Sequence, residues 1–176
     1  MRFLYLFFVF FSCSNTAESI KEFISLENLP IETIINAEIL HSENGKVKVK
    51  IIAGKIERYL NTQPQLLFID GINITFYDDS ANVKSTLIAE RAEIDEVKKI
   101  MTASKNVLLI SSNNKKLETE ILYWDEKRNR IYTDNQVFIT TNKETIVGDG
   151  FISNPDFTEY SISNISGIIN LETATE

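Results

Sequence analysis

The chain has 176 residues, enough for one domain. Acidic residues outnumber basic ones by 25 to 18, and the net charge of −7 argues against nucleic acid as a partner. Hydrophobic residues make up 43% of the chain, with only six glycines and three prolines, so the composition is that of a folded protein.

The first twelve residues have the pattern of a secretory signal. Arg2 is followed by the apolar run 3–11 and then by the small residue Ser12. Such a run rises only about 14 Å as a helix, which is less than the roughly 30 Å hydrocarbon core of a bilayer. Residues 1–12 are therefore predicted to be a signal peptide that is removed from the mature chain.

The chain's only cysteine, Cys13, comes directly after this segment. The order resembles a bacterial lipobox, in which the cysteine is acylated and becomes the first residue of the mature protein. An unpaired thiol is a liability in an oxidising compartment, which favours modification. The alternative is ordinary signal cleavage beside a chance cysteine. Acylation would anchor the chain to a membrane without a span, and residues 13–40 are predicted to be the lipidated N-terminus and tether.

An eight-residue pattern occurs three times in the remaining chain, residues 41–176. Its four positions are separated by steps of 2, 3 and 2. The three copies are Leu87, Ala89, Ala92 and Ile94, then Leu117, Thr119, Leu122 and Trp124, and finally Ile146, Gly148, Phe151 and Ser153. Steps of two keep side chains on one face of a strand. The step of three restores that face after a bulge or bend. A repeat of bent strands predicts a layered β-structure.

The repeat conflicts with local propensity in one segment. Glu and Ala in residues 88–100 favour a helix. We give precedence to the repeat and predict strands there. A degenerate earlier unit is predicted from Ile51, Ala53 and Ile56, continued by Ile72, Ile74 and Phe76.

Few residues point to catalysis or to a bound metal or cofactor. His41 is the only histidine, so the chain lacks the ligands of a usual zinc site. The Gly148-Asp-Gly150 motif is too short for a dinucleotide fingerprint. Carboxylates such as Glu90 and Glu118 are spread over turns and over the outward phase of the repeat rather than paired. We therefore predict a non-enzymatic protein without a cofactor or metal.

The inward face of the repeat is apolar, and it has two interpretations. Its residues fill the core of a closed sandwich, or they line a trough for acyl chains, in which each buried methylene contributes about 0.8 kcal/mol. Trp124 has the phase of Ile94 and is predicted to face the core, although a Tyr123–Trp124 pair could also stack on a sugar.

The same positions carry a resemblance to a known family. Segments 87–95, 117–125, 131–133 and 146–151 resemble the LptC family, the periplasmic component of lipopolysaccharide export. The resemblance covers roughly residues 44–170, and Val137 is a further matching position within that range. It implies an all-β fold, a twisted open β-jelly roll of stacked antiparallel strands, whose apolar interior holds the acyl chains of lipopolysaccharide.

The resemblance also assigns roles to individual residues. Gly148 matches the family's glycine in the last long strand, with a structural or partner-docking role. The interior residues that would contact lipid are Ile72, Ile74, Phe76, Leu87, Ala89, Ala92, Val107, Leu117, Leu122, Trp124, Val137, Ile139 and Phe151.

The implied function is a passive relay in the periplasm, tethered to the inner membrane. Lipopolysaccharide would come from an ABC transporter with membrane subunits LptF and LptG and an ATPase, and would pass to the bridge protein LptA by strand addition. Well-known members carry an N-terminal transmembrane helix, whereas this chain has a short signal and Cys13. The alternatives are a structural or adhesive surface lipoprotein with a closed β-sandwich or β-helix, and a carbohydrate-active β-helix enzyme.

Overall fold

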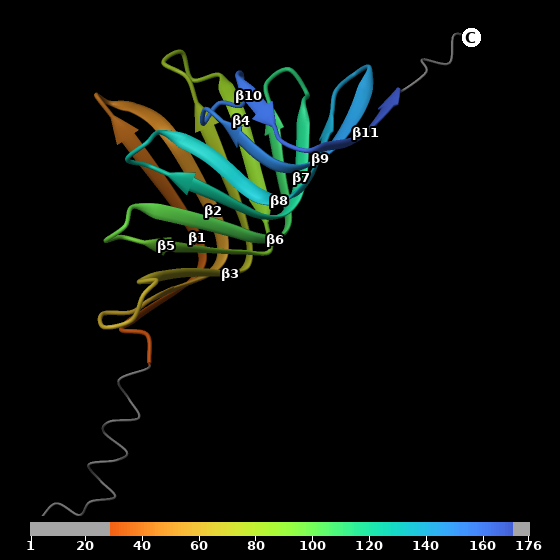
Figure 1. Ribbon diagram of the computed structural model, residues 1–176. Coiled ribbons are helices and arrows are strands. Elements are labelled where there is room, and N and C mark those ends of the chain that lie inside the picture. Colours follow the sequence, from red (N-terminus) through yellow and green to blue (C-terminus); the bar gives the residue numbers. More distant parts are fainter. Residues whose placement is uncertain (1–28, 171–176) are drawn as a thin grey trace, which may run out of the picture.

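The computed structural model describes residues 29–170, which form β-strands and no helix (Figure 1). The strands are β1 (Glu32–Glu43), β2 (Lys46–Arg58), β3 (Leu66–Tyr77), β4 (Val83–Ala89), β5 (Arg91–Asp95), β6 (Ile100–Ser111), β7 (Lys116–Asp125), β8 (Arg130–Thr140), β9 (Glu144–Ser153), β10 (Tyr160–Ile162) and β11 (Ile165–Asn170). No helix in this part of the chain is long and apolar enough to cross a membrane. The signal segment and Cys13 lie outside the described residues.

All eleven strands belong to one sheet, in the order β1-β2-β3-β4-β6-β7-β8-β9-β10. β5 pairs with β3 and β6, and β11 pairs with β9, all antiparallel. The all-β fold predicted from the repeat is confirmed, and residues 88–100 contain the end of β4, β5 and the start of β6 instead of a helix. β1 starts at Glu32, so the predicted boundary between tether and domain, at residues 40 and 41, falls inside the first strand.

The strands bend at one level across the sheet, which explains the step of three in the repeat. β4 ends at Ala89 and β5 begins at Arg91, so the three-residue step crosses the corner at Glu90. The same level carries register shifts between β2 and β3, β6 and β7, β7 and β8, and β8 and β9. In β9 the corner contains Gly150, with φ of 91°, a conformation that glycine adopts at no steric cost.

Backbone hydrogen bonds connect neighbouring corners. The N–H of Gly71 donates to the carbonyl oxygen of Glu90 at 3.0 Å, and the N–H of Glu90 donates to that of Lys105 at 3.1 Å. Asp70 and Lys105 adopt positive φ values of 62° and 65° there. The corners of β3, β6 and the β4–β5 pair therefore form one connected line.

The bend folds the sheet into two layers whose inner faces meet (Figure 1). β4 lies in one layer and β5 in the other, while β2, β3, β6, β7, β8 and β9 each contribute one half to each layer. Phe76 of β3 meets Trp124 of β7 edge-to-face across this interface, with ring centroids 6.0 Å apart. Of the thirteen predicted interior residues, eleven are buried, and Phe76 and Trp124 are half-buried against the core.

Aspartates close three of the turns. Asp78 accepts hydrogen bonds from the N–H groups of Ser80 and Asn82, Asp95 from those of Val97 and Lys98, and the buried Asp125 from that of Arg128. Each carboxyl has a pKa below its ordinary value. The largest cause is the Asn82 side chain at Asp78, the Lys98 N–H at Asp95 and the Arg128 N–H at Asp125.

We predict that the fold loses stability as the pH falls through these lowered pKa values. The folded state favours the charged carboxyl, so its contribution is complete above the ordinary pKa of 3.8 and is lost as the pH falls from there through the lowered pKa. Urea midpoints at pH 7 and pH 3 measure the effect. Asp125→Asn should lower the midpoint at pH 7 and reduce its pH dependence, whereas exposed Asp134→Asn should change neither. An unchanged pH dependence in Asp125→Asn would contradict the prediction.

Candidate functional site

An unbroken row of aliphatic side chains crosses the inner face of one layer from β1 to β11. Each member lies directly opposite the next one in the pairing register, and directly opposed residues share a face of the sheet. The row consists of Ile39, Ile51, Ile74, Leu87, Leu109, Leu117, Ile139, Ile146 and Ile168. We call this row the aliphatic stripe. It provides a continuous apolar surface along the whole length of the sheet.

The aliphatic stripe is buried in the middle and exposed at its two ends. Leu109, Leu117 and Ile139 have no exposed surface, because the opposite layer covers them. At the ends, Ile39 is 39% exposed and Ile168 is 57% exposed. The aliphatic stripe therefore runs from the buried core to both edges of the sheet.

Both edges carry further exposed apolar side chains. β1 is twelve residues long and pairs with β2 alone, with exposed Ile35 and Leu40. β11 lies at the opposite end of the sheet (Figure 1). It exposes Ile165 and Ile169. Natural proteins usually protect long apolar edge strands, because unpaired N–H and C=O groups attract another strand. Both edges are therefore candidate surfaces for strand addition.

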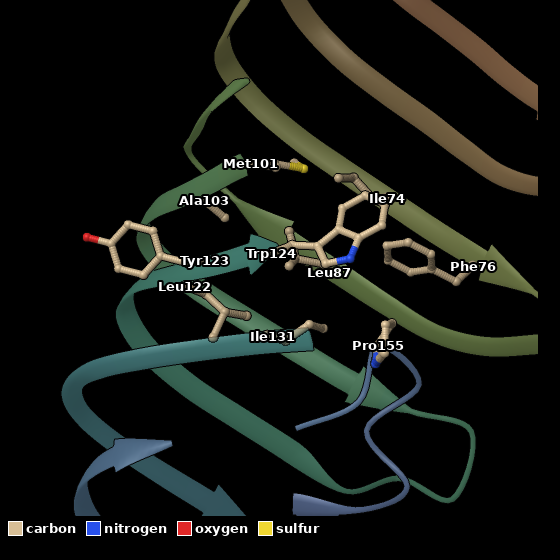
Figure 2. A pocket seen from close by; sticks show the side chains of 10 residues that line it. All are labelled: Ile74, Phe76, Leu87, Met101, Ala103, Leu122, Tyr123, Trp124, Ile131 and Pro155. Carbon is tan, nitrogen blue, oxygen red and sulfur yellow. The ribbon is translucent and has the colours of Figure 1, made fainter. Parts of the chain in front are cut away.

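A narrow apolar cleft, with a free volume of about 20 Å³, lies between the two layers (Figure 2). The residues that line it are Ile74, Phe76, Leu87, Met101, Ala103, Leu122, Tyr123, Trp124, Ile131 and Pro155. The Trp124 ring projects toward Phe76 (Figure 2). Its indole Nε1 is buried without a hydrogen-bond partner among the described residues. The cleft thus offers apolar contact and a single unused donor.

Tyr123 and Trp124 point to different faces of the sheet. Tyr123 points away from the cleft (Figure 2) and stacks on Tyr132, with ring centroids 5.2 Å apart. Arg130 lies over the Tyr132 ring at 5.0 Å. Trp124 packs against the core, as its phase in the repeat predicts. The two side chains therefore do not form a joint platform for a sugar.

The glutamates on the outward phase of the repeat lie outside this apolar interior. Glu90, Glu118 and Glu120 are exposed. Within residues 29–170, no three His, Cys, Asp or Glu side chains are grouped in a way that could hold a metal ion. The described interior offers apolar contact.

Several residues of the aliphatic stripe and of the cleft are absent from the thirteen interior residues predicted from the sequence. Leu109 and Ile146 have the phase of the repeat, which could have identified them. Ile39 and Ile168 lie at the two edges, where the repeat is degenerate, and only the strand pairing shows that they continue the row. Pro155 lies in a loop without any period.

Gly148 allows a close contact between β9 and the connection from β10 to β11. A Cβ atom at this position would lie 2.8 Å from the backbone carbonyl oxygen of Ser163. The bend of β9 itself is at Gly150. Gly148 therefore permits packing, whereas Gly150 permits the backbone conformation.

A family model described as "Lipopolysaccharide-assembly, LptC-related" matches residues 3–164. The chain belongs to the LptC family. This family is a periplasmic component of lipopolysaccharide transport. The protein therefore has a role in lipopolysaccharide transport. A search of curated proteins gives no significant match.

We predict that Gly148→Ala separates β10 and β11 from β9. The added methyl group would press on backbone atoms of Ser163, which cannot rotate away as a side chain can. We expect a loss of about 1–3 kcal/mol in the free energy of unfolding, together with faster hydrogen exchange in β11. Gly167→Ala is the control, because nothing lies within 4 Å of a Cβ at that position. Equal stability of the two variants would count against this role of Gly148.

Proposed function

We propose that this LptC-family chain is a passive relay that receives lipopolysaccharide from an inner-membrane ABC transporter and passes it to the next periplasmic β-jelly-roll protein. The observation that carries the proposal is the aliphatic stripe, which continues to both edges of the sheet. A similar sheet added at either edge would extend the same apolar row. Acyl chains could then move from one protein to the next without leaving apolar surroundings.

Apolar contact suits such a movement physically. Each methylene withdrawn from water contributes about 0.8 kcal/mol, and the interaction has no preferred direction. An acyl chain that advances by one strand exchanges its contact with Leu117 for a contact with Ile139, for example, and loses little binding energy. Net movement then requires an external energy source, which is the ATPase of the partner transporter in this proposal.

The two edges of the sheet would bind different partners. The β1 edge would pair with the periplasmic β-domains of LptF and LptG, and the β11 edge with LptA. Strand addition at such edges draws its affinity from backbone hydrogen bonds and its specificity from alternate side chains. The exposed Ile35 and Leu40 on β1, and Ile165 and Ile169 on β11, supply apolar side chains for both contacts.

The anchor in this proposal is an acyl group on Cys13, retained at the inner membrane after removal of residues 1–12. The sheet starts at Glu32. A fully extended tether from Cys13 to this strand spans roughly 65 Å, at about 3.4 Å per residue. The β1 edge would thus remain close to the membrane that contains the transporter.

The burial of the central stripe favours the second candidate function, a structural or adhesive surface lipoprotein with a closed sandwich. Leu109 and Leu117 are covered by the opposite layer, and a purely structural protein would keep them covered. The two candidates differ in whether lipid reaches the interior in cells.

We predict that a photo-crosslinking amino acid at Phe76 or Leu122 forms adducts with lipopolysaccharide in living cells. Both side chains line the cleft. Glu118 is the matched control, because it is exposed on the outer face of β7. Adducts are detected by immunoblotting for lipopolysaccharide on the purified protein. Adducts at Glu118 with none at Phe76 and Leu122 would contradict the relay and favour the closed lipoprotein.

We also predict that Cys13→Ala abolishes metabolic labelling of the protein by a fatty acid, because the thiol is the acceptor. Ser14→Ala keeps the cysteine and should retain the label. Labelling that persists in Cys13→Ala would disprove a lipid anchor at this residue.

A further inference from the structure

The loop between β9 and β10, residues 154–159, inserts an aromatic ring between the two layers. Phe157 has no exposed surface, and its ring lies 5.6 Å from that of Phe151 and 5.3 Å from that of Tyr160. Pro155 from the same loop lines the apolar cleft opposite Phe76 and Trp124 (Figure 2). The loop therefore fills interior space that the strands leave open.

This loop is a self-contained unit with a strained backbone. The side-chain Oδ1 of Asn154 accepts hydrogen bonds from the N–H groups of Thr158 at 3.0 Å and Glu159 at 3.1 Å. The N–H of Phe157 donates to the carbonyl oxygen of Asn154 at 3.1 Å. Phe157 adopts φ of 56°, a region that bulky residues rarely occupy. Burial of its ring offsets that strain, so the strained conformation depends on the ring staying in place.

Two lysines fasten the loop, Lys84 on β4 and Lys115 in the turn between β6 and β7. The Nζ of Lys84 on β4 lies 2.9 Å from the carboxylate of Asp156. The Nζ of Lys115 donates to the carbonyl oxygen of Phe157 at 3.0 Å and lies over the rings of Phe157 and Tyr160. Burial raises the pKa of Asp156, but hydrogen bonds from Lys84 and Thr158 together lower it by more, so the net shift of the pKa is downward. The carboxylate is therefore charged, as an ion pair requires.

A groove with both charged and apolar lining residues adjoins the apolar cleft at this loop. Lys84 and Asp156 line the groove, and it shares Phe76, Trp124 and Pro155 with the cleft. An amphiphile with its chains in the cleft would place its headgroup in the groove, beside Lys84. Lysine binds phosphate as a point charge.

We propose that the β9–β10 loop is a plug in the apolar interior, which acyl chains displace by moving Pro155 and Phe157. A phosphate of the lipid headgroup then replaces Asp156 as the ion-pair partner of Lys84. This proposal rests on the proposed lipid relay and deepens it. Without lipid, the plug keeps apolar surface out of water. With lipid, the acyl chains take over that role, and the strain at Phe157 is released.

The first experiment tests whether the loop detaches without lipid. Hydrogen–deuterium exchange is measured on the purified full-length chain, on Asp156→Asn and on Asp79→Asn. Asp79 is the matched control, because it pairs with Lys48 on the same groove but lies outside the loop. We expect the amides of residues 157–159 to exchange about three- to tenfold faster in Asp156→Asn alone, with amides of β3 and β7 unchanged. Loop amides that exchange only together with these strands would overturn the plug.

The second experiment adds bis-phosphorylated lipid A and follows the fluorescence of Trp124, the only tryptophan in the chain. We expect Asp156→Asn to bind about three- to tenfold more tightly than Asp79→Asn, although both remove one negative charge. Bound lipid A should accelerate exchange in residues 157–159 while it slows exchange in β3, and Lys84→Gln should reduce the preference for lipid A over its dephosphorylated form. Slower exchange in the loop on binding would overturn the proposal.

The two experiments separate the failure of this inference from the failure of the relay. If lipid A binds none of the variants, the relay and the headgroup exchange at Lys84 are both contradicted. The lipid-free exchange rates still decide, by themselves, whether the loop is a detachable plug.

Discussion

The bend shared by neighbouring strands is the constraint on which the rest of the structure depends. Side chains alternate between faces along a strand, so a single extra residue moves every later side chain to the opposite face. Without the step of three between Ala89 and Ala92, or between Thr119 and Leu122, the apolar side chains after the bend would point away from the core. The hydrogen bonds from Gly71 to Glu90 and from Glu90 to Lys105 connect the corners. The layers can therefore face each other only when adjacent strands bend together.

This arrangement imposes a conflict between stability and transport. A stable sheet needs the middle of its apolar face covered, and Leu109, Leu117 and Ile139 are fully buried. A lipid carrier needs the same face to be accessible. The ends of the aliphatic stripe at Ile39 and Ile168 reconcile the two needs in part, since they are exposed at edges where another sheet can cover them. The proposed plug at Phe157 reconciles them in the interior, because it provides a removable covering.

The sequence predicts those parts of the structure that obey a short period. Steps of two identify the strands and their inward phase, and the resemblance to the LptC family names thirteen interior residues, all of which lie in or against the core. Features without a period remain outside its reach. β1 begins at Glu32, within the predicted tether. The sequence does not predict this strand, because its apolar residues lack the 2, 3, 2 pattern. The burial of Phe157 depends on contacts with Lys115 and Tyr160, which follow from folding and from no local pattern.

Charge limits how such a protein can hold its cargo. The chain has a net charge of −7, and the phosphates of lipid A are anionic, so electrostatic attraction over the whole surface is unfavourable. The lysines beside the cleft are already paired, Lys48 with Asp79 and Lys84 with Asp156. A headgroup can therefore gain a lysine only by displacing a carboxylate, which makes the net electrostatic gain small. Binding in the proposed relay then comes mainly from acyl chains on an apolar surface, and a surface of that kind can both accept a lipid and release it to the next sheet.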